Sequence, residues 1–489
     1  MATHQLDEVN LDTVDLSHVH FIGIGGAGMS GLARIVLSRG YAVSGSDAND
    51  SRVLFALKSM GAEVFVGHEA SQIAGATVVV ISYAAIPDDN PELVAAKEAG
   101  IPIICRSDLL ALLMRDSEEF LIAGTHGKTS TTSMAVTALQ EAGVDPSFAI
   151  GGQLNKSGTN AHQGTEAYFV AEADESDASL LKYRPKVAVV TNIEPDHLDY
   201  FGDAESYHTV FRDFVKNILP GGSLIVCLED EHARALGLYA QEYAASLPEA
   251  SRFSVYGYGD STYGTDIPLL VELYSVEGQE GTVVIQLADR EVQATIEFRA
   301  VGRHMILNAC GAVAGAIRLL ADRADSTLVK KLLRGVAGFT GVRRRFELKG
   351  EILTGPYAGV EVYDDYAHHP TEVDAVVRAA RTKTQGRVVV VFQPHLYSRT
   401  MEFAAEFATA LALADQVVVL DIYGAREKPV EGVDGRIISD KIPGAVFEPN
   451  FSQVPARMRD IARPDDLIIT MGAGSVTMLS EEILRELSS

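Results

Sequence analysis

The chain has 489 residues, of which 47% are hydrophobic and 22% are charged, and its formal net charge is -25. It is too long for one ordinary hydrophobic core, so we expect about three domains. A protein this acidic lacks the basic face that binding to nucleic acid or an anionic membrane would require. No apolar run approaches the roughly 20 residues that span a bilayer.

The N-terminal residues 1–17 are polar and acidic, which does not fit a signal peptide. The cysteines Cys105, Cys227 and Cys310 are widely spaced and each lies beside apolar residues. They form no metal-binding pattern and are typical of reduced thiols. We therefore expect a cytoplasmic protein without membrane insertion.

The first predicted unit is a βαβ segment. A strand over residues 18–25 leads through a glycine turn into a helix, and a second strand over residues 41–46 ends at Asp47. The turn contains Gly25, Gly26 and Gly28. Such glycines let a phosphate approach the backbone, and Asp47 could bind a ribose hydroxyl. Alternatively, the glycines serve only helix–strand packing.

Strands and helices continue to alternate, which predicts a Rossmann-like domain over residues 1–117. Ser82 and His68 lie at or near the carboxyl ends of predicted strands, where open α/β sheets bind ligands. Considered alone, His68 is more often an ordinary surface histidine.

The second predicted domain covers residues 118–338 and begins with a strand, a glycine loop and a helix. The loop and the first helical turn read Gly124, Thr125, His126, Gly127, Lys128, Thr129 and Ser130. Amides of such a loop bind phosphates, Lys128 would add positive charge, and the Thr129 hydroxyl would bind Mg²⁺. The loop is shorter than the usual G-x-x-x-x-G-K-[ST], because Ile122 replaces its first glycine. A turn followed by a surface lysine is the alternative to this ATP-binding loop.

Two further strands of this domain end in polar residues. The strand over residues 168–172 ends at Glu172, before an acidic cluster, and the strand over residues 187–193 precedes His197. Glu172 and Thr129 offer the oxygen ligands that Mg²⁺ prefers, and His197 could bind a second metal or a phosphate. Acidic clusters are usually solvated loops, but the position at a strand end favours a site.

Strand-like segments between residues 223 and 299 predict a β-rich extension of the central domain. In the helix that follows, His304 and Asn308 are four residues apart and share one face. Asn308 has the amide geometry to pair with an adenine edge. The sequence alone does not distinguish this role from an ordinary pair on a helix surface.

Residues 339–489 form the third predicted domain, a second open α/β unit. Basic residues lie near its start, and strands over residues 387–392, 416–421 and 466–471 end beside polar residues. Because two such domains flank the phosphate-loop domain, we expect the chemistry to occur between them.

Six motifs follow one another along the chain: Gly23–Met29, Gly124–Thr129, Glu172–Asp177, Thr191–His197, Asp364–Pro370 and Gln393–His395. Their order resembles that of the Mur ligase family. The resemblance implies an α/β protein of three domains: a Rossmann-like N-terminal domain for a UDP-sugar, a central P-loop ATPase domain with a mainly parallel sheet and the β-rich extension, and a Rossmann-like C-terminal domain for an amino acid.

The resemblance also implies amide formation that uses ATP and Mg²⁺ in cytoplasmic peptidoglycan precursor synthesis. ATP would phosphorylate the lactyl carboxylate of UDP-N-acetylmuramate, and the amine of L-alanine would attack the acyl phosphate, which leaves ADP and phosphate. We expect a monomer or weak homodimer.

The family pattern implies a role for each matching residue. The UDP-sugar would be held by Gly25, Gly26, Gly28, Asp47, His68 and Ser82, and the ATP phosphates and metals by Lys128, Thr129, Glu172 and His197. The nucleotide would also meet His304, Asn308 and Asp364, with Arg344 or Arg345 at the transferring phosphoryl group. Tyr366, His368 and Arg399 would form the alanine site. That His368 also accepts a proton from the amine is a hypothesis.

The chain departs from the family pattern at three places. Met305 follows His304 where asparagine is common, Leu396 follows the Gln-Pro-His segment where arginine is common, and Arg212 stands where sibling ligases carry a carbamylated lysine. Three alternatives remain open: a ligase that recycles a murein tripeptide onto the same sugar nucleotide, a nicotinamide-dependent oxidoreductase, and a nucleotide sensor without activity.

Overall fold

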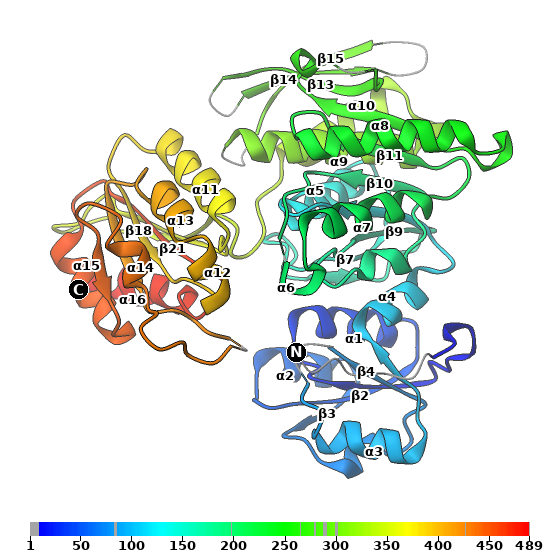
Figure 1. Cartoon of the computed structure of the whole chain (residues 1–489), viewed down its shortest axis with the longest axis horizontal. Coiled ribbons are helices and arrows are strands. Elements are labelled where there is room, and N and C mark those ends of the chain that lie inside the picture. Colours follow the sequence, from blue (N-terminus) through cyan, green and yellow to red (C-terminus); the bar gives the residue numbers. More distant parts are fainter. Residues whose placement is uncertain are drawn as a thin grey trace. The chain divides into compact units, whose positions relative to one another are not determined.

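The computed structural model describes residues 9–82, 86–196, 198–264, 266–277, 280–286, 291–298, 302–425 and 427–488. The chain divides into two compact units (Figure 1). Unit 1 comprises Met1–Ser275, Thr282–Ile296 and Leu307–Phe339, and unit 2 comprises Val276–Gly281, Glu297–Ile306 and Thr340–Ser489. In the part of the chain described here, no helix has both the length and the apolar character needed to cross a membrane.

The N-terminal sheet of unit 1 is fully parallel, with strand order β3-β2-β1-β4-β5. Its strands are β1 (His18–Ile22), β2 (Ala42–Asp47), β3 (Glu63–Val66), β4 (Val78–Ile81) and β5 (Ile103–Cys105). Its helices are α1 (Ala27–Ser38), α2 (Arg52–Ser59), α3 (Pro91–Ala99) and α4 (Arg106–Met114). The first strand ends three residues earlier than expected, because the turn begins at Gly23, whose φ of +82° favours glycine.

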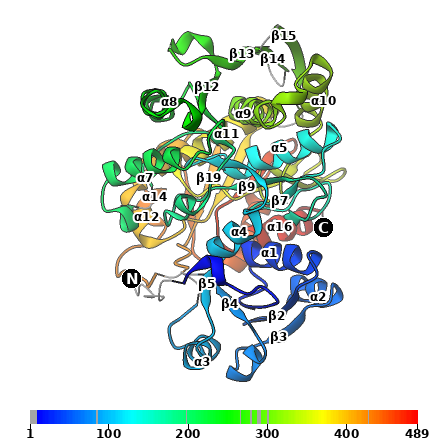
Figure 2. The same ribbon diagram turned by 90° about the vertical axis from the view of Figure 1, so that its right-hand side faces the viewer.

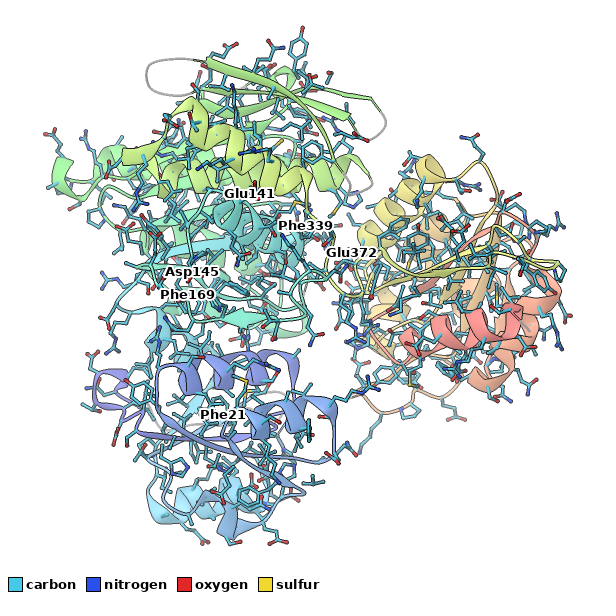
Figure 3. The ribbon with its side chains drawn as sticks, turned by 180° about the vertical axis from the view of Figure 1, so that it is seen from behind. Phe21, Glu141, Asp145, Phe169, Phe339 and Glu372 are labelled. Atoms are coloured by element: carbon cyan, nitrogen blue, oxygen red, sulfur yellow. The ribbon has the colours of Figure 1, made fainter. Side chains whose placement is uncertain are left out.

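Both faces of this sheet are buried, as is typical of parallel sheets. Phe21 of β1, labelled in Figure 3, belongs to the core on one face, and Ile22 belongs to the core on the other. The core that contains Phe21 also contains Phe169 of the central sheet, so the two sheets of unit 1 share one continuous core.

The central sheet of unit 1 has the order β15-β14-β13-β12-β11-β10-β6-β9-β7-β8 (Figure 2). The strands are β6 (Glu118–Ala123), β7 (Ser147–Ala149), β8 (Ala161–His162), β9 (Tyr168–Glu172), β10 (Val187–Val190), β11 (Ser223–Cys227), β12 (Ser254–Gly259), β13 (Leu269–Glu277), β14 (Glu280–Gln286) and β15 (Glu291–Glu297). The helices are α5 (Lys128–Glu141), α6 (Leu198–Phe201), α7 (Ala204–Lys216), α8 (Glu231–Ser246), α9 (Arg303–Leu319) and α10 (Ser326–Ala337). Strand β6 pairs in parallel with both β9 and β10, which brings three strand ends to one edge.

The small residues of α9 allow this helix to lie directly on the central sheet. A Cβ atom at Gly315 would collide with the ring of Phe120 on β6 and would lie 3.1 Å from a methyl group of Val189 on β10. The predicted β-rich extension is confirmed, because β12 to β15 continue this sheet on one side.

Unit 2 contains a six-stranded sheet with the order β16-β17-β21-β18-β19-β20, in which only the β16–β17 pair is antiparallel. The strands are β16 (Glu347–Glu351), β17 (Glu361–Asp365), β18 (Val388–Phe392), β19 (Gln416–Leu420), β20 (Val446–Glu448) and β21 (Leu467–Met471). The helices are α11 (Pro370–Lys383), α12 (Tyr397–Glu402), α13 (Ala404–Leu411), α14 (Arg436–Ser439), α15 (Val454–Ile461) and α16 (Thr477–Ser488).

Helices cover both faces of this sheet. Alternate residues of β18 enter different cores, Val390 with α11 and α13, and Val391 with α15 and α16. The expected Rossmann-like C-terminal domain is therefore confirmed.

Candidate active site

The phosphate loop connects β6 to α5 and needs glycine at two positions. Gly124 and Gly127 have φ angles of +128° and +83°, which side chains other than glycine rarely adopt. A Cβ atom at Gly124 would also lie 2.9 Å from the carbonyl oxygen of Asn192. The loop amides and the start of α5 can therefore form an anion site at the end of β6.

The segment that follows β10 holds the loop in place. Thr191 Oγ1 and Asn192 Nδ2 both donate to the carbonyl oxygen of His126, at 2.6 and 2.9 Å. The amide of His126 donates to Asn192 Oδ1, and Thr125 Oγ1 donates to the carbonyl oxygen of Glu194. The imidazole of His126 lies 2.9 Å from a carboxylate oxygen of Glu194. Thr125 and His126 thus support the loop through side-chain contacts.

Lys128 lies against its own loop and a buried carboxylate. Its Nζ donates to the carbonyl oxygens of Gly124 and Thr125 at 2.6 and 3.2 Å, and it lies 2.8 and 2.9 Å from the two carboxylate oxygens of Glu175. Burial is the largest single effect on Lys128 and lowers its pKa, but the carboxylates of Glu175, Asp174 and Glu172 together outweigh burial and raise the lysine pKa. Burial raises the pKa of Glu175 to about 7, although Lys128 opposes this shift. The ammonium group is therefore held at the loop.

Two oxygen-bearing side chains meet beside the loop. Thr129 Oγ1 donates to Glu172 Oε2 at 3.1 Å, and the other carboxylate oxygen of Glu172 accepts the amide of Gly151 at 2.7 Å. A hydroxyl and a carboxylate at this spacing are donors of the kind that Mg²⁺ prefers. Ser130 is buried in the first turn of α5, and His197 lies outside the described residues.

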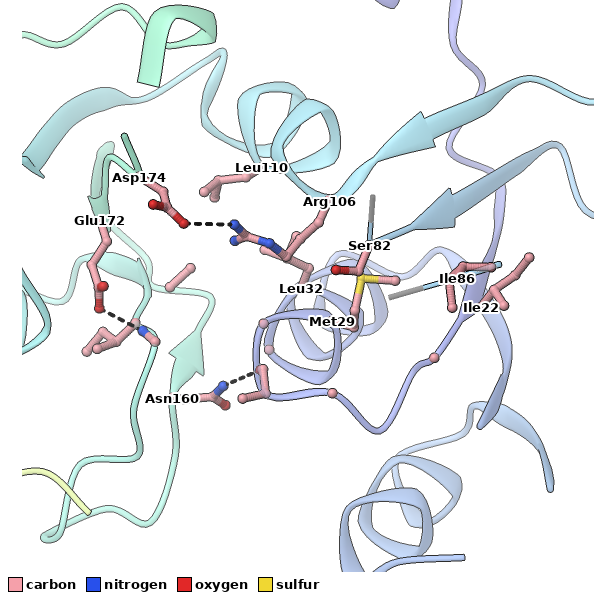
Figure 4. Close-up of a pocket in the computed structure, with 18 residues that line it drawn as sticks. Ile22, Met29, Leu32, Ser82, Ile86, Arg106, Leu110, Asn160, Glu172 and Asp174 are labelled. Atoms are coloured by element: carbon pink, nitrogen blue, oxygen red, sulfur yellow. Dashed lines mark hydrogen bonds and ion pairs between the residues drawn. The ribbon is translucent and has the colours of Figure 1, made fainter. Parts of the chain in front are cut away.

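A cavity of about 350 Å³ extends from the N-terminal glycine turn to Glu172 (Figure 4). Among the predicted residues, Gly26, Gly28, Ser82 and Glu172 line it. Its two walls are joined where Asn160 Nδ2 donates to the carbonyl oxygen of Ala27 at 2.7 Å. The structure therefore places the predicted sugar-nucleotide turn and the predicted metal ligand on one cavity.

Arg106 and Asp174 also line this cavity, and the sequence reasoning did not select either of them. The Arg106 side chain reaches across the glycine turn, because a Cβ atom at Gly28 would lie 2.9 Å from its Cδ. Arg106 Nη2 lies 3.8 Å from Asp174 Oδ2 (Figure 4). Arg106 directly follows β5, so the rule that selected Ser82 at a strand end could have found it.

Gly25, Asp47 and His68 do not line the cavity. The carboxylate of Asp47 accepts the amide of Gly25 at 3.0 Å and so holds the glycine turn. His68 Nδ1 lies 2.9 Å from Ser46 Oγ, which donates to the buried Glu92. These residues support the turn and the neighbouring strand end.

Asn308 of α9 lies beside the phosphate loop. A Cβ atom at Gly127 would approach its Oδ1 to 2.8 Å. His304 stands four residues earlier on the same helix, and burial lowers its pKa to about 4, which keeps the imidazole neutral at neutral pH.

In unit 2, Asp364 is fully buried at the end of β17. Its carboxylate accepts hydrogen bonds from Thr470 and Thr477, at 3.0 and 2.5 Å, and lies 3.5 Å from Arg344 Nε. Arg344 Nη2 also donates to the carbonyl oxygen of Gly472 at 2.6 Å. Asp364 and Arg344 therefore form part of one polar network within the unit.

Tyr366 and His368 follow β17 and lie close together. Their rings pack edge to face with centroids 5.2 Å apart, and the guanidinium carbons of Arg344 and Arg345 lie 4.9 and 5.5 Å from the Tyr366 ring centroid. Arg399 is buried on α12. The sequence reasoning missed Glu372, which lies 3.2 Å from His368 Nδ1. The four-residue spacing to a histidine near a helix start is the signal that could have identified it.

Three family models match the chain in sequence order. They are the Mur ligase family catalytic domain at residues 18–118, the Mur ligase middle domain at residues 122–316, and the Mur ligase glutamate ligase domain at residues 344–474.

Relatives and solved structures agree with this match. UDP-N-acetylmuramate–L-alanine ligases from Rhodococcus erythropolis and Mycolicibacterium smegmatis are 50% and 51% identical to the chain, over 97% of it and 97% and 95% of their own lengths. The crystal structure of UDP-N-acetylmuramate–alanine ligase from Thermotoga maritima is 26% identical with a TM-score of 0.74, over 96% of this chain and 98% of that one. Because these matches cover nearly the whole chain, it belongs to the Mur ligase family.

Proposed function

We propose that the protein joins L-alanine to the lactyl carboxylate of UDP-N-acetylmuramate. ATP would first phosphorylate the carboxylate, and the alanine amine would then displace phosphate from the acyl phosphate. A carboxylate needs this activation because its oxygen is a poor leaving group until it carries a phosphoryl group. The relatives that share about half of the sequence over nearly its full length are ligases with this pair of substrates in their names.

The position of Glu172 is the observation that carries the proposal. Its carboxylate accepts the hydroxyl of Thr129 on the phosphate loop, and it also lines the cavity that begins at Gly26 and Gly28. A triphosphate on the loop would therefore present its terminal phosphate near the cavity, and a UDP-sugar in the cavity would present its carboxylate there. Phosphoryl transfer requires this kind of alignment.

Mg²⁺ fits the oxygen donors at this position. Thr129 and Glu172 would hold the ion, which when bound neutralises phosphate charge. The ammonium group of Lys128 would place a further positive charge beside the transferring phosphoryl group. His197 remains a predicted metal ligand.

Each of the three predicted domains would bind one of the substrates. Residues 1–117 would bind the UDP-sugar, with Arg106 at the diphosphate of the sugar nucleotide and Asp47 supporting the glycine turn. Residues 118–338 would bind ATP, with Asn308 and His304 near the adenine. Residues 339–489 would bind alanine through the set Tyr366, His368 and Arg399, and would contribute Asp364, Arg344 and Arg345 to the nucleotide.

The acceptor distinguishes this proposal from the recycling alternative, in which a murein tripeptide replaces alanine. Family membership favours a ligase over a nicotinamide-dependent oxidoreductase. We also expect a cytoplasmic location, as required for a sugar-nucleotide substrate, and a monomer or weak homodimer, which analytical ultracentrifugation would test.

The deciding experiment measures phosphate release from Mg·ATP and UDP-N-acetylmuramate with L-alanine, with the murein tripeptide, or without an acceptor. We expect release that requires L-alanine, together with a new amide product detected by mass spectrometry. A preference for the tripeptide would assign the recycling reaction instead, and no release with any acceptor would refute ligase activity.

A matched pair of variants tests the metal assignment. Thr129→Ala should raise the Mg²⁺ concentration for half-maximal rate by about tenfold, equivalent to one charge-assisted contact. Thr137→Ala alters a threonine of the same helix that donates to the Ser133 carbonyl oxygen and should leave the Mg²⁺ dependence unchanged. An equal Mg²⁺ dependence in both variants would remove Thr129 from the metal site.

A further inference from the structure

The imidazole of His368 has one ring nitrogen between two oxygen acceptors. Nδ1 lies 3.1 Å from the carbonyl oxygen of Tyr366 and 3.2 Å from Glu372 Oε2. A carbonyl oxygen and an ionised carboxylate can only accept hydrogen bonds, so Nδ1 must carry the hydrogen. In a neutral imidazole the lone pair is then on the other nitrogen, Nε2.

Glu372 is held in an environment that favours its ionised form. It occupies the first turn of α11, where the helix dipole stabilises a negative charge. Its Oε2 accepts the backbone amide of His368 at 3.1 Å, and its Oε1 lies 3.7 Å from Arg345 Nη1. The same carboxylate therefore fixes both the backbone and the ring of His368.

The other charged and titratable groups around the pair come from neighbouring elements of unit 2. The ring of His395 lies 5.8 Å from that of His368, the guanidinium groups of Arg344 and Arg345 lie over Tyr366, and the buried Asp365 interacts with Glu372. The rings of Tyr366 and His395 pack edge to face against the His368 ring, and among the contacts described for this ring only Glu372 and the Tyr366 carbonyl face Nδ1 at hydrogen-bonding distance.

We propose that Glu372 is a positioning residue that fixes His368 as the Nδ1–H tautomer, so that Nε2 accepts a proton from the amino-acid substrate. This inference rests on the proposed ligase function and adds the residue that prepares the base. The substrate ammonium gives one proton to Nε2, and its nitrogen lone pair attacks the carbonyl carbon of the acyl phosphate. The new C–N bond forms as the C–O bond to phosphate breaks, and the second proton leaves the nitrogen with the departing phosphate.

A first test reads the tautomer directly, without substrates. In protein labelled with ¹⁵N-histidine, long-range ¹H–¹⁵N spectra should show the His368 signal, assigned with His368→Gln, as the Nδ1–H form. Glu372→Gln should shift a substantial fraction to the Nε2–H form, because an amide NH₂ can donate to Nδ1. Asp374→Asn, on the same helix but paired with the exposed Arg378, should leave the signal unchanged. An Nε2–H signal in the wild-type protein would overturn the proposal.

A second test separates proton transfer from general damage by changing the nucleophile. Hydroxylamine is neutral near pH 7.5 and needs no base, whereas the amine of L-alanine is mostly protonated there. Glu372→Gln should lower kcat for L-alanine by about tenfold, a part of the roughly 10²- to 10⁴-fold contribution of a general base, while hydroxamate formation should stay within about twofold of wild type. The loss of kcat with alanine should become smaller as the pH rises toward the pKa of the alanine amine, because more of the amine is then already deprotonated.

The outcomes distinguish this inference from the proposed function. If the wild-type protein forms no amide with alanine, both are refuted. If the wild-type protein forms the amide but Glu372→Gln loses alanine and hydroxylamine activity equally at every pH, the ligase function stands and Glu372 is only structural. Glu372→Asp, which keeps the carboxylate on a shorter arm, should recover part of the alanine rate.

Discussion

In unit 1 the shape of the phosphate loop depends mainly on the backbone geometry of its glycines, whereas the proposed amino-acid site of unit 2 is positioned mainly by side chains. Gly124 and Gly127 adopt left-handed φ angles, and the carbonyl oxygen of His126 accepts two hydrogen bonds from the segment after β10. In unit 2, by contrast, His368 is held by Glu372, and Tyr366 lies under two arginines. The glycines of the first site form a local pattern in the sequence, whereas the second site depends on the directions of its side chains, which such a pattern does not show.

Removal of the loop lysine should produce the largest effect. Lys128→Ala should lower ATP turnover by about 10²- to 10³-fold, because the charge at the transferring phosphate is lost. It should also lower the free energy of unfolding by about 3 kcal/mol at pH 8, because Glu175 remains buried without its partner. Phosphate release and urea unfolding measure the two effects.

The double variant Lys128→Ala/Glu175→Gln separates charge burial from catalysis. It should regain most of the lost stability, since no buried charge is left, and none of the lost turnover. Recovery of turnover would show that the lysine serves only to neutralise Glu175. The contrast between the phosphate loop and the amino-acid site would then be wrong.

Arg106→Ala should have the next largest effect and tests whether binding of the sugar nucleotide in unit 1 also depends on a single side chain. The KM for UDP-N-acetylmuramate should rise by about 10- to 100-fold, because a guanidinium–phosphate contact contributes about 1.5–3 kcal/mol. The KM for ATP should change little, since Arg106 lines the cavity and not the loop. Arg106→Lys, which keeps the charge and loses the planar fork, should recover part of the affinity. Equal changes in both KM values would instead indicate that Arg106 stabilises the fold of unit 1 and does not bind the sugar nucleotide.

This contrast explains how much of the molecule could be predicted from its sequence. The three-domain α/β fold followed from apolar strand runs, glycine turns and helical periodicity, because parallel sheets bury both faces and leave continuous hydrophobic runs. The loop from Gly124 to Ser130 followed from its local pattern. Glu172 and Ser82 followed from the rule that ligands bind at the carboxyl ends of strands, and the structure places both on one cavity.

Other features depend on tertiary contacts that a single sequence does not reveal. Asp47 remains a predicted ribose ligand, and in the structure its carboxylate also accepts the amide of Gly25, a contact that no local pattern indicates. Glu175 lies in an acidic cluster that resembles a solvated loop, and its pairing with Lys128 arises only when β9 lies beside β6. Glu372 gains its importance from the direction in which the His368 ring points, which rotamer and packing determine.

Arg344→Lys should have a moderate effect and tests the side-chain scaffold of unit 2. Lysine keeps the charge but cannot contact Asp364, the Gly472 carbonyl and the Tyr366 ring with one planar group. The free energy of unfolding should fall by about 1–2 kcal/mol, because the carboxylate of the buried Asp364 loses its contact with the guanidinium group. Urea unfolding monitored by tyrosine fluorescence measures it. A loss of turnover without any loss of stability would show that Arg344 acts on the nucleotide and contributes nothing to the scaffold.

His304→Gln should produce the smallest effect on stability, seen as a change in its pH dependence. Burial lowers the pKa of His304 to about 4 in the folded protein, whereas an unfolded histidine titrates near 6.5. The unfolded chain therefore binds a proton between these values that the folded protein excludes, so the wild-type protein loses stability as the pH falls from about 6.5 to 4. The variant lacks this group and should lose about 1 kcal/mol less between pH 7.5 and 5.5, as measured by urea unfolding at both values. Parallel pH profiles would mean that water reaches the imidazole, and His304 would then be free to change its charge when a nucleotide binds.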